Sequence, residues 1–231
     1  MKNNLSFSHS LVKILTALSL LCILLVACRI YYTGGFRYLW LIWNLFLAWI
    51  PLFFVMLWHR NKNIQKSNLR SSFLLLSWLI FFTNAPYILT DLFHLLNYGK
   101  APLWYDLILI LSFAWTGLLT GFVSLMEIQN FFNYKFGKFC GWCVSVFALI
   151  LGSFGVYIGR YGRFNSWEII TNPFQLSNDI LTMIVNPLDY TRMYGMTFFF
   201  SCFLILTYLS LVILIESKNK TVNKQSNEYK F

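Results

Sequence analysis

The stretch NAPYILTDLFHLLNY, residues 84–98, decides how this chain folds, because it is polar and must still begin inside a lipid bilayer. The apolar run before it, residues 73–82, supplies only about half of the roughly 20 residues that a membrane span needs. The span therefore continues into the polar stretch. Read as an α-helix, the stretch places five side chains on one face, at intervals of 3, 4, 3 and 4: Asn84, Tyr87, Asp91, His94 and Tyr98.

The composition around this stretch is that of a multi-span membrane protein. Of the 231 residues, 58% are hydrophobic and 11% are charged, and a soluble domain of this composition would expose large apolar patches. We predict an all-α fold, a polytopic bundle of about six transmembrane helices in a single integral membrane domain. The expected spans are residues 11–28, 38–58, 71–91, 107–126, 141–159 and 194–215.

The net charge of +10 is unevenly distributed over the predicted loops. With six spans, twelve of the eighteen Lys and Arg residues fall on the side of both termini and six on the other side. The positive-inside rule then places both termini in the cytoplasm. Because this sidedness accounts for the positive charge, no nucleic-acid partner is expected.

The first apolar segment has two interpretations. Its ending, LVAC at residues 25–28, resembles a lipoprotein cleavage box, after which Cys28 would be lipidated and the segment before it removed. An uncleaved first helix is favoured, because Arg29 follows at once and apolar runs often end in such residues by chance.

Local signals inside the spans predict how the helices meet. Pro86 disfavours a helical backbone at the preceding residue, so the third span is expected to break there, and residues 88–98 could then lie along the membrane surface. Asn44 is predicted to donate an interhelical hydrogen bond. Small residues form stripes along the fourth and fifth spans, from which we predict that these two helices pack closely on each other.

The longest loop, residues 160–193, is expected to lie outside and to contain short amphipathic helices. Asn165 with Glu168 forms a capping-box variant. The pairs Asn172-Pro173 and Asn186-Pro187 each indicate a helix start. Between these pairs we predict an amphipathic helix on the outer leaflet.

The predicted outer face gathers polar and ionisable residues from two regions of the chain, and such residues at membrane depth indicate a site. The candidate ligand-binding residues are Asn84, Tyr87, Thr90, Asp91, His94, Asp106, Arg160, Arg163, Asn165, Ser166, Trp167 and Glu168.

Two interpretations of this face stand about even. Arg160 and Arg163 have the spacing to hold a phosphate or carboxylate, with Asp91 orienting His94. Alternatively, Asp91 and Glu168 pair with the arginines and fix the loop to the bundle. A metal site is not expected, because the stripe offers one histidine and no outward cysteine, and no cofactor motif is present.

Three segments together resemble a known family. They are YLWLIWNLFLAWIPL at residues 38–52, NAPYILTDLFHL at residues 84–95 and GRYGRFNSWE at residues 159–168. They are similar to the hallmark segments of DUF1361, a family of bacterial integral membrane proteins whose function is unknown. The resemblance covers roughly residues 35–215 and implies a multi-span protein of the bacterial cytoplasmic membrane. It implies no activity and no catalytic residue.

The sequence thus favours a membrane protein that binds an anionic, lipid-linked or envelope-associated ligand at its outer face, in contact with membrane lipids. The alternative is an accessory subunit without a ligand. An intramembrane transferase or hydrolase would use His94 as base, but Ser166, the only outward candidate nucleophile, is equally explained by helix capping. A transporter is not supported, because no inverted internal repeat is evident.

Overall fold

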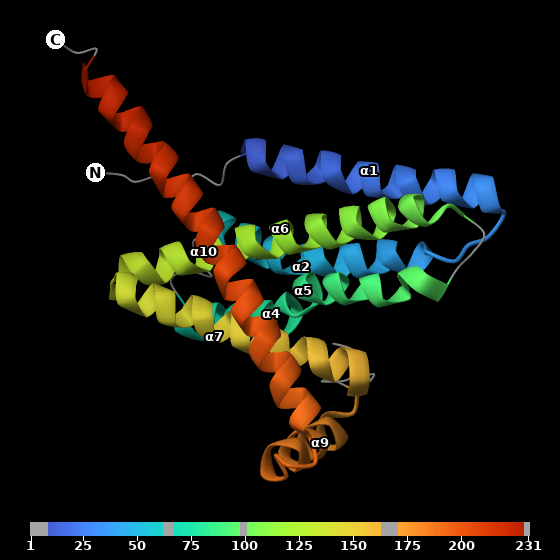
Figure 1. Cartoon of the computed structure of the whole chain (residues 1–231). Coiled ribbons are helices and arrows are strands. Elements are labelled where there is room, and N and C mark those ends of the chain that lie inside the picture. The colour runs from blue at the N-terminus through green and yellow to red at the C-terminus, as the bar shows by residue number, and fades with distance from the viewer. Residues whose placement is uncertain (1–8, 62–66, 98–100, 163–170, 229–231) are drawn as a thin grey trace.

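The chain folds into a bundle of long helices. The structure is a computed structural model and describes residues 9–61, 67–97, 101–162 and 171–228. In chain order its elements are α1 (His9–Thr33), α2 (Leu39–Arg60), α4 (Asn68–Phe82), α5 (Asn84–Tyr87), η1 (Ile88–Asn97), α6 (Leu103–Phe136), α7 (Lys138–Tyr157), η2 (Ile158–Gly162), α9 (Pro173–Val185) and α10 (Thr191–Glu228). In Figure 1, α1, α2, α6 and α7 run along a common direction, and α10 crosses them at a steep angle.

Six helical segments in the described ranges are long and apolar enough to cross a membrane. They are Ser10–Thr33, Leu39–Arg60, Asn68–Leu95, Leu103–Phe136, Lys138–Gly162 and Thr191–Lys218. The protein is therefore a multi-pass, all-α membrane protein, as its composition predicts.

Several helices extend beyond the predicted spans. α6 has 34 residues where the sequence predicts a span over residues 107–126. At 1.5 Å per residue such a helix is about 50 Å long, well beyond the roughly 30 Å of a hydrocarbon core. An apolar run ends where polar residues begin, but a helix continues as long as its backbone hydrogen bonds are satisfied, so apolar counting underestimates helix length.

α6 is the central helix of the bundle. The buried share of its apolar window is 61%, compared with 17% for α1. One core cluster joins it to α1 and α2 through Leu41 and Phe113, and a second joins it to α4, α7 and α10 through Phe82 and Phe122.

Four glycines of α6 and α7 lie close to the third span. A methyl group added at Gly121 would come within 2.5 Å of the Ala85 side chain, and one at Gly155 within 2.5 Å of Thr83. Gly117 and Gly152 face Ile88 and Phe82 in the same way. α6 and α7 do pack together, so the predicted close packing of these two helices is confirmed. The glycines named above, however, contact the third span.

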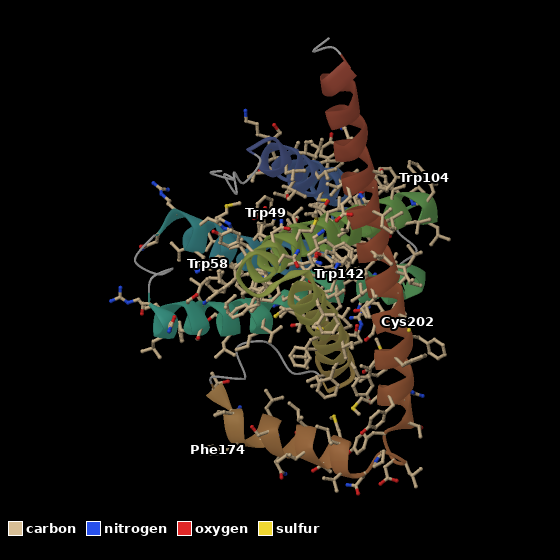
Figure 2. All side chains as sticks on the ribbon, turned by 90° about the vertical axis from the view of Figure 1, so that its left-hand side faces the viewer. Trp49, Trp58, Trp104, Trp142, Phe174 and Cys202 are labelled. Carbon is tan, nitrogen blue, oxygen red and sulfur yellow. The ribbon has the colours of Figure 1, made fainter. Side chains whose placement is uncertain are left out.

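The long loop also differs in part from its prediction. The amphipathic helix is present as α9, with Pro173 in its first turn, although the Asn172 side chain makes no capping hydrogen bond. Asn186-Pro187 does not start a helix, because a turn follows it and α10 begins at Thr191. Figures 1 and 2 show α9 at the edge of the molecule, near the start of α10.

Candidate functional site

The third span changes its helix type within the polar stretch that begins at Asn84. Pro86 has no N–H group, and its ring clashes with the carbonyl of residue 82, where α4 ends. Side chains near the break satisfy neighbouring carbonyls: Thr83 donates to Ile80, and Asn84 donates to Phe81. The backbone then continues as the 3₁₀-helix η1.

η1 is part of the bundle and does not form a surface segment. Ile88, Thr90 and Asp91 are buried, and Asp91 has no exposed surface. The expectation that residues 88–98 lie along the membrane is therefore wrong for the described part, residues 88–97, because η1 packs against α6. A 3₁₀-helix has three residues per turn, so Asp91 and His94 remain aligned.

Arg160 is the centre of the site. Its Nη2 donates to the Thr90 carbonyl and lies 3.4 Å from Asp91 Oδ1, and its Nη1 lies 3.1 Å from His94 Nε2. From α2, Asn44 donates to Asp91 Oδ2 over 3.0 Å, so the predicted interhelical hydrogen bond of Asn44 is present. The site therefore joins the second, third and fifth spans.

A π-helical turn and aromatic rings position the Arg160 side chain. Residues Ile158–Gly162 form the π-turn η2, an element that often marks functional sites. The guanidinium carbon lies 5.4 Å from the Tyr87 ring centroid and 5.5 Å from that of Phe93, within cation–π range. The side chain of Arg160 is 14% exposed, so little water competes for its hydrogen bonds.

The geometry fixes the role of His94. An arginine can only donate, so His94 Nε2 accepts and the ring is neutral with its proton on Nδ1. Within the described ranges no hydrogen bond joins His94 to Asp91, because the guanidinium group of Arg160 contacts both. The contact by which Asp91 would orient His94 is therefore absent among the described residues, and the role of His94 as a base stays a prediction.

A second ion pair joins α1 to α6. Arg29 Nε is 2.6 Å from Asp106 Oδ1, and Arg29 Nη2 is 3.0 Å from Oδ2, a bidentate pair. The guanidinium carbon also lies 4.3 Å from the Tyr38 ring centroid. Both charged side chains are almost fully buried, at 3% and 2% exposed. Asp106 therefore belongs to this pair. The sequence had grouped it with Arg160, and the structure does not place it there.

The sequence did not single out Arg29, although this residue forms a buried ion pair. A signal was present, because Arg29 ends one apolar run and Asp106 begins another, and a charge at membrane depth requires a partner of opposite sign. At the opposite end of the bundle, His59 Nε2 lies 3.4 Å from Glu127 Oε2. No pattern in the sequence predicted this contact.

The structure places the remaining candidates as follows. Five of them come together: Tyr87, Thr90, Asp91, His94 and Arg160. Asn84, on α5, donates a hydrogen bond to the Phe81 carbonyl of α4. Arg163, Asn165, Ser166, Trp167 and Glu168 lie outside the described residues. Among the described residues, no group of three His, Cys, Asp or Glu side chains could hold a metal ion.

The fold and this site define a polytopic helical membrane protein with ion pairs buried between its spans. The chain belongs to DUF1361, whose description is "Protein of unknown function" and whose match covers residues 43–227. No curated protein and no solved structure matches the chain.

Proposed function

We propose that this protein binds an anionic amphiphile, a lipid-linked or envelope-associated molecule with a phosphate or carboxylate group, at Arg160. One observation carries the proposal: the Nε–H of Arg160 is buried and has no acceptor among the residues that the structure describes. Buried donors without acceptors are rare and costly. A phosphate or carboxylate oxygen is the acceptor that guanidinium geometry suits best.

The surroundings of Arg160 fit an amphiphile better than a small soluble anion. The Phe93 ring beside the guanidinium group is 62% exposed, which offers an apolar surface to a hydrocarbon chain. Trp40 packs edge-on against His94, at 5.2 Å between ring centroids, and supports that side of the site. The ligand would therefore place its charge on Arg160 and its apolar part toward the lipid.

A second candidate function is that of an accessory subunit without a ligand. The observation that favours it is the engagement of both Asp91 oxygens, one by Asn44 and one by Arg160. In this interpretation the contacts only fix η2 against η1.

Thermal unfolding of the purified chain separates the two functions, measured with phosphatidylglycerol and with phosphatidylcholine. Arg160→Gln leaves the Asp91 carboxylate buried and unpaired. This should lower the free energy of unfolding by about 3–5 kcal/mol, whether or not Arg160 binds a ligand. Asp91→Asn removes the acid and keeps the guanidinium group. If Arg160 holds an anion, Asp91→Asn retains or increases the stabilisation that phosphatidylglycerol gives over phosphatidylcholine, and the double variant Asp91→Asn/Arg160→Gln loses it.

Arg192→Gln is the matched control, because Arg192 is an exposed arginine that stacks on Tyr161, next to Arg160 in the chain. It should leave the lipid dependence unchanged. Equal stabilisation by both lipids in the wild type, together with recovery of stability in the double variant, would contradict ligand binding and support the accessory subunit.

We also propose that the protein lies in a bacterial cytoplasmic membrane with both termini in the cytoplasm. The distribution of Lys and Arg over the loops supports this orientation. The Arg160 site would then face the outer leaflet.

A further inference from the structure

A polar pocket lies at the end of the bundle opposite to Arg160, where α6 ends and α7 begins. Its volume is about 240 Å³, below the roughly 300–1,000 Å³ of sites for drug-sized ligands. Its polar wall comes from three helices: Gln129, Asn130 and Asn133 on α6, Lys138 and Trp142 on α7, and Glu216 on α10. Trp142 is labelled in Figure 2, on the end of the bundle that faces the viewer.

The pocket contains one positive and one negative side chain that do not pair with each other. Among the described residues the ion pairs are Arg29–Asp106, His59–Glu127 and Arg160–Asp91, and Lys138 and Glu216 form none. Elsewhere this protein brings buried opposite charges to 2.6 Å. Lys138 and Glu216 line the same pocket without forming an ion pair. A pocket with two separate opposite charges is complementary to a ligand that itself carries both charges.

The uncharged groups beside these two charges are three amides and an indole ring. The Oδ1 atom of Asn133 is buried against Gly141 of α7, so the acceptor that the pocket offers to an ammonium group is the exposed carboxylate of Glu216. Gln129 is held in place, because the Tyr208 hydroxyl donates to its Oε1 atom. The Trp142 ring packs against Tyr208 at 6.1 Å between centroids, and it offers a π-face to a cation.

We propose that this pocket binds a compact zwitterion, with its phosphate or carboxylate on Lys138 and its primary ammonium group on Glu216. Two sources provide such a group: the head group of phosphatidylethanolamine, or a free zwitterion such as phosphoethanolamine. The pocket opens where the apolar spans give way to polar helix ends, at the depth of lipid head groups. This proposal is independent of the function proposed for Arg160.

The test uses the full chain in the Asp91→Asn/Arg160→Gln background, so that lipid held at Arg160 does not contribute. Bound lipid is counted by native mass spectrometry during titration with phosphatidylethanolamine or phosphatidylcholine, and phosphoethanolamine is titrated separately. Phosphatidylcholine is the matched probe, because its methylated ammonium group has no N–H donor. We expect phosphatidylethanolamine to bind at least about tenfold more tightly than phosphatidylcholine.

Lys138→Gln and Glu216→Gln should each weaken this binding about tenfold or more, since each removes one charge-assisted contact. Both side chains are exposed, so the variants should fold. Lys135→Gln is the control: Lys135 stacks on Phe131 and Phe136 and does not line the pocket. Binding of phosphoethanolamine with the same variant pattern would identify the free zwitterion as a ligand.

Equal affinity for both lipids, unchanged in the Lys138→Gln/Glu216→Gln double variant, would overturn the proposal. Loss of binding in Lys135→Gln to the same extent would also overturn it, because a general surface charge and not the pocket would then recruit the lipid.

Discussion

At the scale of single residues, two arginines of this protein differ in how completely they are satisfied. Arg29 makes a bidentate pair with Asp106, and both side chains are almost fully buried. Arg160 makes one long contact to a carboxylate and keeps its Nε–H without an acceptor in the described ranges. The first geometry is that of a structural pair, and the second leaves one N–H donor for which the described residues supply no acceptor.

Arg29→Gln should therefore destabilise the protein strongly and without any dependence on lipid type. It leaves the Asp106 carboxylate buried and unpaired, which costs about 3–5 kcal/mol. Adding Asp106→Asn should recover much of this loss, because no charge then remains buried. Thermal unfolding of the two single variants and the double variant measures the coupling. Additive losses would mean that the pair contributes no interaction of its own.

At the scale of elements, the third span is held between the glycines of α6 and α7. Its helix is interrupted at Thr83, one turn before Pro86, and this part of the backbone fits because Gly121 and Gly155 allow a close approach. This packing sets the position of η1, and η1 supplies Thr90, Asp91 and His94 to the Arg160 site.

Gly121→Ala should lower the stability by about 1–3 kcal/mol, because the added methyl group would come within 2.5 Å of the Ala85 side chain and the helices must separate. Gly195→Ala is the matched control, since nothing lies within 4 Å of a methyl group there. In that open helical position alanine should be neutral or stabilising by up to about 1 kcal/mol. Equal effects of the two changes on thermal unfolding would show that the close contact at Gly121 does not limit packing.

At the scale of the whole molecule, the six spans place α9 and the α6–α7 turn on opposite sides of the membrane. The chain crosses once as α7 between the turn at Gly137 and the loop that leads to α9. Any measurement of sidedness at these two points therefore determines the orientation of the full bundle.

Single cysteines at Asn178 on α9 and at Tyr134 near the end of α6 test this orientation in a cysteine-free background. Both positions are exposed. An impermeant maleimide added to intact cells should label Asn178→Cys and leave Tyr134→Cys unlabelled, and permeabilised cells should show labelling at both. The reverse pattern in intact cells would place both termini outside and invert the assignment of the Arg160 site to the outer leaflet.

The sequence by itself determined the class of fold and the approximate positions of the spans, because apolar run length is matched to bilayer thickness. It also determined local features: a helix interruption near Pro86, which lies at Thr83, the helix α9 and the alignment of Asp91 with His94. These depend on residues near one another in the chain.

Only the tertiary structure decided which distant residues meet. Arg29 and Asp106 are 77 positions apart, and Arg160 and Asp91 are 69 apart, so their pairing depends on which helices are neighbours. Periodicity shows that a helix has a small or polar face and does not show what that face contacts. For this reason the sequence grouped Asp106 with Arg160, whereas the tertiary structure places them in two separate ion pairs. The sequence also did not show that Ala85 and Thr83 of the third span lie against Gly121 and Gly155.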